Sequence, residues 1–249
     1  VDASQESGVI LTFTDFGSAG PYLGQMEAAV RREAPSADVI HLQSDAPACN
    51  PKFSAYLLAA LANQFDAAVF LCVVDPGVGG ARRPLLIGSR GQWFVGPDNG
   101  LFAPLLQQRQ AEEFCIHQIL QHPSGAAKTF HGRDLFASVA AKVYKKQYIK
   151  TNITSKLEVG TEWQGDLYEF IYADHYGNLF SGVRGSCIDS SARLVVGGRR
   201  IAWAPQFDAV APGEAFWYVN SCGLVEVAVN GGRADRLFSN LRKNIIEII

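Results

Sequence analysis

The stretch that decides the fold runs from Val73 to Arg83 and reads Val-Val-Asp-Pro-Gly-Val-Gly-Gly-Ala-Arg-Arg. An unbroken apolar run, Ala67 to Val74, leads into it, and this length and composition predict a strand buried on both faces. A buried strand that ends in Asp-Pro-Gly places the carboxylate of Asp75 at the carboxyl edge of a sheet, where open α/β folds bind ligands. On its own, the stretch is equally compatible with an ordinary turn that carries two solvated arginines. Other segments of the same kind decide between these interpretations.

The first half of the chain alternates strand-like and helix-like patterns. Strands are expected at 9–14, 39–42, 67–74, 85–88 and 93–95, and helices at 22–33, 53–63 and 134–145. This βαβα order predicts an α/β N-terminal domain with a mostly parallel sheet and helices on both faces. We place this catalytic domain at residues 8–155.

Beyond about residue 148 the pattern changes. A polar stretch, 150–164, is expected to be a linker or a run over the surface, and short β-rich segments follow at 167–172, 194–196, 215–219, 224–229 and 245–249. Short strands separated by glycine turns predict a smaller, all-β antiparallel barrel or sandwich. We place this β-rich, substrate-binding domain at residues 165–249.

Composition excludes several classes of function. The 249 residues carry a formal net charge of −2 and no cluster of lysine and arginine, so nucleic acid is not expected as a partner. The longest apolar runs have the length of strands, so no membrane-spanning helix is expected. The five cysteines show no C-x-x-C spacing, which argues against a zinc site and fits a reducing compartment such as the cytoplasm. The chain starts at Val1, so a removed leader stays open as an alternative.

Five segments share one design, in which a strand or turn ends in small residues and exposes one or two polar side chains. They are Thr14–Gly17, Asp75–Gly79, Pro97–Gly100, Phe130–Asp134 and Asp174–Asn178. Each alone is more often a satisfied turn or a helix cap, and Asp134 stands where a helix N-cap belongs. Five such segments in one chain, four of them in the first half, indicate a shared cleft.

Sequence motifs narrow the chemistry of that cleft. The patterns G-x-x-x-x-G-K-[ST], G-x-G-x-x-G and G-x-S-x-G are absent, which disfavours nucleoside triphosphates, dinucleotides and serine-hydrolase chemistry. A set of carboxylates remains, with one histidine and one arginine. Such a set fits either a metal-free site that activates water or a metal-dependent phosphoesterase. The second would hold Mg²⁺ or Mn²⁺ with Asp15, Asp75, Asp98 and His131.

Six motifs, in order along the chain, resemble those of the S-adenosylmethionine hydrolases, also called hydroxide adenosyltransferases. They are T-D-F-G, V-V-D-P-G-V-G-x-x-R-R, G-P-D-N-G-L, F-H-G-R-D, D-x-x-G-N and N-S-x-G-x-x-E-x-A-V. The resemblance covers residues 9–237 and extends to relatives that attack the same substrate with fluoride or chloride. It implies the two-domain fold described above and a homotrimer with active sites at subunit interfaces. It also implies hydrolysis of S-adenosyl-L-methionine to adenosine and L-methionine at the ribose C5′, without a cofactor.

The resemblance assigns roles to individual residues. Asp75, Arg82 and His131 would handle the attacking water. Halide-using relatives carry other residue types at the Asp and His positions, so water is the expected nucleophile. The substrate would be bound by Asp15 at the ribose hydroxyls, Asp174 at the methionine ammonium, Tyr176, Asn178 and Phe207 around adenine, and Ser221 and Cys222 through main-chain or side-chain contacts. Phe207 is equally compatible with an ordinary core aromatic, and the resemblance leaves open which of Asp75 and His131 accepts the proton.

The chain also departs from the family pattern. It has His41–Ser44 where the family commonly reads Asp-Leu-Thr-His, and Cys49 where an aromatic side chain usually walls the sugar. These changes affect the ribose side of the site and leave the three water-handling residues intact. Two alternatives therefore stay open beside the hydrolase: a non-catalytic protein that binds S-adenosylmethionine or adenosine, and a halide-using halogenase.

Overall fold

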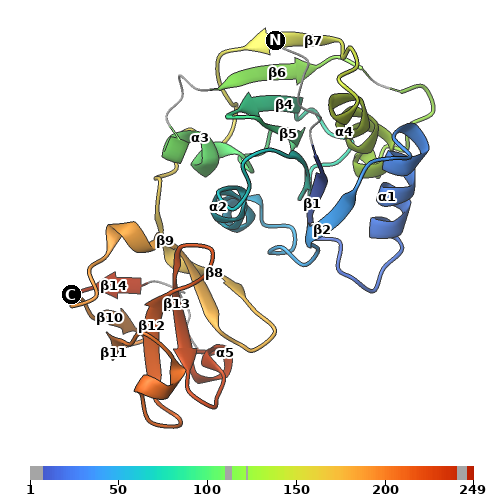
Figure 1. Cartoon of the computed structure of the whole chain (residues 1–249). Helices are drawn as coiled ribbons and strands as arrows, with labels where there is room; N and C mark the ends of the chain where they lie inside the picture. Colours follow the sequence, from blue (N-terminus) through green and yellow to red (C-terminus); the bar gives the residue numbers. More distant parts are fainter. Residues whose placement is uncertain (1–7, 110–113, 122, 240–245) are drawn as a thin grey trace. The chain divides into compact units, whose positions relative to one another are not determined.

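The computed structural model describes residues 8–109, 114–121, 123–239 and 246–249 (Figure 1). The chain divides into two compact units, with the main division between Trp163 and Gln164. Each unit has a seven-stranded sheet and a hydrophobic core of its own. Within the described residues, no helix is long and apolar enough to cross a membrane.

The sheet of the first unit has the order β2-β1-β3-β5-β4-β6-β7. Its strands are β1 (Ile10–Thr14), β2 (Val39–Gln43), β3 (Val69–Val73), β4 (Pro84–Ser89), β5 (Gln92–Pro97), β6 (Cys115–Ile119) and β7 (Thr151–Thr154). The pairs β1–β2, β1–β3 and β3–β5 are parallel, whereas β4–β5, β4–β6 and β6–β7 are antiparallel. Strand β6 therefore runs in the same direction as β5, whereas β4 and β7 run in the opposite direction. Most strands are parallel to one another, and the sheet is mixed. The expected α/β domain is confirmed at this level.

The expected linker 150–164 contains a strand of this sheet. Residues Thr151–Thr154 form β7, which pairs with β6 along one edge. An edge strand has a neighbour on one side only, and Ile153 is 84% exposed there. This exposure explains why the segment has no apolar pattern in the sequence.

Helices cover both sides of this sheet in Figure 1, with α1 (Tyr22–Glu33) and α4 (Ala137–Tyr144) on one side and α2 (Pro51–Ala62) and α3 (Ala103–Arg109) on the other. Helix α1 begins after Pro21 and buries Leu23, Met26 and Val30, whose spacing defines one helical face. Met26 and Val30 share a core with Val139 and Val143 of α4. A single π-helical turn, η2 (Gly132–Phe136), precedes α4, so this helix starts slightly earlier than the expected 134–145.

The second unit is a sheet with the order β14-β10-β11-β12-β13-β9-β8. Its strands are β8 (Leu167–Ala173), β9 (Leu179–Arg184), β10 (Leu194–Val196), β11 (Arg199–Trp203), β12 (Ala215–Val219), β13 (Leu224–Val229) and β14 (Ile246–Ile248). The edge strands β14 and β8 contact each other, so the sheet curls into a nearly closed barrel. Ile245, expected to open the last strand, lies outside the described residues.

The expectation of an antiparallel second domain is wrong at one pair. Strands β11 and β12 are parallel, while the other strand pairs described in this sheet are antiparallel. Parallel neighbours need a crossover connection, and residues 204–214, with the 3-10 turn η4 (Phe207–Ala209), supply one here. The prediction assumed that tight glycine turns join every pair of neighbouring strands. The unit also includes a short helix, α5 (Ala234–Leu237).

Candidate active site

Three neighbouring parallel strands of the first unit end in polar residues. Asp15 follows β1, Asp75 follows β3 after one further valine, and Asp98 follows β5. Because β1, β3 and β5 are adjacent and parallel, their carboxyl ends lie at one edge of the sheet. The predicted position of Asp75 at the carboxyl edge of a parallel sheet is therefore confirmed.

Arg82 joins Asp75 to His131. Its Nε lies 3.1 and 3.0 Å from the two carboxylate oxygens of Asp75, and its terminal Nη2 lies 2.5 Å from Oδ2. The same Nη2 lies 3.0 Å from Nδ1 of His131. The Arg82 guanidinium also sits over the ring of Phe136, 5.4 Å from its centroid. The side chains of Arg82 and Asp75 are only 10% and 3% exposed, so this is a nearly buried charge pair.

The glycine loop 76–81 brings Arg82 close to the segment that carries His131. Gly79 has a φ of +79°, a conformation that side chains rarely tolerate, and a Cβ there would collide with the carbonyl oxygen of Lys128. Main chain therefore approaches main chain at this point. The residue before His131, Phe130, packs edge-on against Phe16 and Tyr22, with ring centroids 5.8 and 5.3 Å away.

Asp75 and His131 line one cavity of about 180 Å³. It is lined by Asp15, Phe16, Cys49, Val73, Asp75, Pro76, Val78, Thr129, Phe130, His131 and Gly132. Three of the five polar segments predicted to share a cleft, those of Asp15, Asp75 and His131, therefore meet here. One oxygen of Asp15, Oδ2, accepts the main-chain N–H of Cys49 at 2.8 Å.

The two departures from the family pattern have different consequences. His41 lies outside this cavity, with Nδ1 2.9 Å from the Thr12 hydroxyl and Nε2 3.2 Å from Glu27. Cys49 lines the cavity and holds a positive φ of 53°. Its main-chain bond to Asp15 shows that the small residue still positions the carboxylate, although it offers no ring as a wall.

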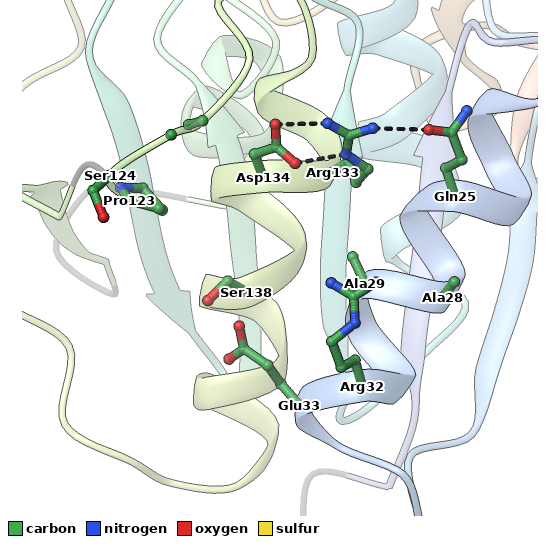
Figure 2. Close-up of a pocket in the computed structure, with 12 residues that line it drawn as sticks. Gln25, Ala28, Ala29, Arg32, Glu33, Pro123, Ser124, Arg133, Asp134 and Ser138 are labelled. Atoms are coloured by element: carbon green, nitrogen blue, oxygen red, sulfur yellow. Dashed lines mark hydrogen bonds and ion pairs between the residues drawn. The ribbon is translucent and has the colours of Figure 1, made fainter.

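A polar network supports the helix start that carries His131. Figure 2 shows Arg133 between Asp134 and Gln25 of α1, with distances of 2.6 and 2.9 Å to the two carboxylate oxygens and 2.8 Å to the amide oxygen. Asp134 also accepts the main-chain N–H of Ala127 at 2.8 Å. These hydrogen bonds, led by that from Arg133, lower the pKa of the Asp134 carboxyl.

The expected N-cap role of Asp134 is wrong. The N-cap position belongs to His131, which makes no side-chain cap bond, because the π-helical turn begins at Gly132. Asp134 lies in the first turn, where its charge still favours the helix N-terminus.

Asp98 serves a different ion pair from Asp75. Its side chain is fully buried, and its Oδ2 accepts bonds from Nε and Nη2 of Arg83 at 2.9 and 2.5 Å. It also accepts the main-chain N–H of Glu158 at 3.2 Å. The four residues of the alternative metal site are therefore not brought together, and the described residues contain no group of three or more His, Cys, Asp or Glu able to hold a metal ion.

The remaining predicted residues belong to the second unit, which has a cavity of about 620 Å³. The cavity is lined by Asp174, Tyr176, Asn178, Phe180, Phe207, Tyr218, Asn220, Ser221, Glu226, Val229, Gly231 and Gly232. Asp174 accepts the main-chain N–H of Asn178 at 2.8 Å and its side-chain amide at 3.1 Å. Cys222 is not part of the lining, and its N–H donates to the Asn220 side chain at 3.0 Å.

Sequence reasoning assigned no role to three polar residues of this second cavity, although two of them, Asn220 and Glu226, belong to the motif N-S-x-G-x-x-E-x-A-V. Tyr218 donates its hydroxyl hydrogen to Glu226, and the Asn220 amide donates to the other carboxylate oxygen at 2.9 Å. Glu226 is only 2% exposed, and burial raises its pKa. Burial, together with the neighbouring Glu226, also raises the pKa of Tyr218. A charged residue inside the apolar strand 224–229 was the signal available in the sequence.

The fold and the first cavity define a class of protein: a two-unit chain whose α/β unit holds an Asp–Arg–His cluster where parallel strands end. Models of the SAM hydroxide adenosyltransferase N-terminal and C-terminal domains match residues 10–152 and 168–244. The chain belongs to the SAM hydroxide adenosyltransferase family.

Individual relatives agree over both units. The chain is 34% identical over 239 residues to the (R)-S-adenosyl-L-methionine hydrolase of Salinispora arenicola, covering 91% of this chain and 92% of that protein. The protein of the same name from Thermus thermophilus is 33% identical over 240 residues, covering 89% and 91%. A solved structure of an uncharacterized conserved protein from Thermotoga maritima superposes with a TM-score of 0.83 at 28% identity, covering 96% of this chain and 99% of that one.

Proposed function

We propose that this protein hydrolyses S-adenosyl-L-methionine to adenosine and L-methionine. Membership of the SAM hydroxide adenosyltransferase family and the names of its curated relatives support this reaction. The observation that carries it in the structure is Arg82 bonded to both Asp75 and His131 beside the cavity that Asp15 also lines.

Catalysis of this reaction requires mainly that the enzyme position the reactants and stabilise charge electrostatically. Water attacks C5′ of the ribose, a C5′–O bond forms, and the C5′–S bond breaks with its electron pair going to sulfur. Because the leaving group is a sulfonium, methionine departs with a neutral sulfur and needs no general acid. The protein must hold the water in line behind C5′ and remove one of its protons as the C5′–O bond forms, so that the oxygen gains hydroxide character. We assign to Arg82, which is always cationic and is bonded to Asp75, the stabilisation of this hydroxide character.

Binding roles follow from the chemistry of the side chains that line the two cavities. In the first unit, Asp15 has one oxygen bonded to Cys49 and a second that can accept ribose hydroxyls. In the second unit, Asp174 pairs with the methionine ammonium, while Tyr176, Asn178 and Phe207 surround adenine. Ser221 lines the same cavity, and Cys222 contributes through the turn that it forms with Asn220.

The test of the reaction is chromatography of the products formed from S-adenosylmethionine with and without a chelator, each with and without high chloride. Adenosine and methionine are the expected products in all four conditions. If 5′-chloro-5′-deoxyadenosine were the main product in chloride, the assignment of water as nucleophile would be overturned. Binding without turnover would favour the non-catalytic protein, and activity lost in chelator would favour a metal enzyme.

The family resemblance further supports a homotrimer as the active form, with active sites at subunit interfaces. Light scattering combined with turnover across a dilution series tests this assembly. Turnover should fall as the trimer dissociates, and a fully active monomer would contradict it. The cytoplasm is the proposed compartment, because the five cysteines are all free thiols.

A further inference from the structure

We infer that His131 is a positioning residue that accepts a hydrogen bond from Arg82, and that Asp75 alone takes the proton from the attacking water. This inference rests on the proposed hydrolysis and decides which of the two groups is the base. It follows from the hydrogen-bond donors and acceptors that each of these groups has.

The contact between Arg82 and His131 fixes the form of the imidazole. A guanidinium has five N–H donors and no lone pair to offer. The Arg82 nitrogen lies 3.0 Å from Nδ1 of His131, so Nδ1 must be the acceptor. A neutral imidazole carries one N–H, which then sits on Nε2. Neither ring nitrogen keeps a free lone pair in this form, so the ring cannot accept a proton while Arg82 stays in place.

The surroundings of His131 also disfavour a cationic ring. Protonated Nδ1 would set an N–H against the N–H of Arg82 and place a second cation beside a guanidinium. His131 further occupies the N-cap of the continuous segment 132–144, where the helix dipole opposes positive charge. Of the carboxylates near His131, Asp75 is paired with Arg82, and Asp134, whose charge also interacts with His131, is paired with Arg133. Asp15 and Cys49 complete the titratable groups that line the cavity.

Asp75 retains the capacity to accept a proton. Its Oδ2 receives the two shorter Arg82 contacts, at 3.0 and 2.5 Å, whereas Oδ1 receives one at 3.1 Å. A carboxylate oxygen has two lone pairs, so Oδ1 keeps one for the water. Attack of water on C5′ yields a protonated alcohol, which is a much stronger acid than a carboxylic acid. A carboxylate paired with arginine is therefore basic enough to take that proton as the C5′–O bond forms.

Two substitutions separate an acceptor from a base. In His131→Asn, the side-chain carbonyl oxygen can replace Nδ1 as the acceptor for Arg82, but the amide cannot take a proton. In the matched control His131→Leu, the acceptor is lost as well. We expect single-turnover hydrolysis to fall by about 10- to 150-fold in His131→Leu, the cost of one hydrogen bond to a charged group. The fall in His131→Asn should be less than about fivefold, with a pH–rate profile parallel to that of the wild type.

Nitrogen-15 NMR of histidine-labelled protein provides a readout that does not depend on turnover. The resonances missing from His131→Asn identify His131, and the Nε2–H tautomer is expected at pH 8. An Nδ1–H tautomer would overturn the inference, and so would equal losses of roughly 10²- to 10⁴-fold in both variants. If the wild type did not hydrolyse S-adenosylmethionine at all, the proposed function would fail, while the tautomer would still test the arrangement of Arg82 and His131.

Discussion

Replacing Asp75 by asparagine should separate the chemistry of the site from the stability of the fold. The amide keeps the shape of the carboxylate but removes its charge from a pair whose side chains are 3% and 10% exposed. Breaking a buried ion pair costs about 3–5 kcal/mol of unfolding free energy. Arg82 keeps its contacts with Nδ1 of His131 at 3.0 Å and with the Phe136 ring at 5.4 Å, so we expect the lower value, about 3 kcal/mol.

The effect of Asp75→Asn on catalysis should be much larger than its effect on binding. Loss of the proton acceptor lowers the single-turnover rate by about 10²- to 10⁴-fold. Affinity for S-adenosylmethionine, measured by calorimetry, should change by less than about threefold, because the water is held for the transition state.

Asp98→Asn is the matched control for Asp75→Asn. It makes the same chemical change in the neighbouring buried pair, where Asp98 is fully buried and Arg83 is 16% exposed. Urea denaturation should show a loss of about 3–5 kcal/mol, while the rate at a temperature where the variant is folded stays within about threefold of the wild type. The reasoning is refuted if Asp75→Asn turns over normally, or if both variants lose the same fraction of activity.

Two further substitutions test the ribose contact and the buried carboxyl of the second unit. Asp15→Ala should weaken substrate binding by about 30- to 1000-fold, or roughly 2–4 kcal/mol, and should lower the rate of hydrolysis of bound substrate by a smaller factor. Asp45→Ala, outside the cavity, is the control and should change neither quantity. An unchanged calorimetric affinity in Asp15→Ala would remove Asp15 from the ribose site. Burial raises the pKa of Glu226 above its ordinary 4.5, so the folded state holds that proton more tightly than the unfolded chain does. The resulting stability is fully present below the ordinary value and is lost as pH rises through the folded-state pKa. Glu226→Gln has no proton to lose, so its stability does not decrease in this way as the pH rises. The difference in melting temperature, variant minus wild type, should therefore increase between about pH 4.5 and pH 7.5. A difference that stays constant over this range would argue against a carboxyl that retains its proton.

Local sequence signals predicted the first unit well because its pattern is set by burial. The strand at 67–74 is apolar throughout, and the structure buries β3 completely, so the position of Asp75 at the sheet edge followed. The contact between Arg82 and His131 joins residues 49 positions apart in the chain. No local pattern predicts such a contact, and the family resemblance supplied it.

What the sequence could not predict depended on contacts between distant segments. The parallel pair β11–β12 results from the crossover 204–214, and the turn residues inside it, such as Pro212 and Gly213, do not show in which direction the next strand pairs. The cap position of His131 results from a π-helical turn, and helix propensity alone favours Asp134 there. Glu226 was overlooked because the partners that hold its two oxygens, Tyr218 and Asn220, are visible only after β12 and β13 pair.

The hydrogen bonds of Asn99 and Arg133 have a consequence for how substrate binding energy is used. The Asn99 bond to the Val74 carbonyl at 2.8 Å lies next to Asp75, and the Arg133–Gln25 bond lies close to His131, so these bonds hold two segments that line the cavity. The conformational entropy of these segments is therefore lost when the protein folds and not when the substrate arrives. Such preorganisation leaves the energy of the remote substrate contacts available for the transition state. Binding of S-adenosylmethionine to the first cavity should accordingly be a single kinetic step. No second, slow phase in which these segments become ordered should be observed.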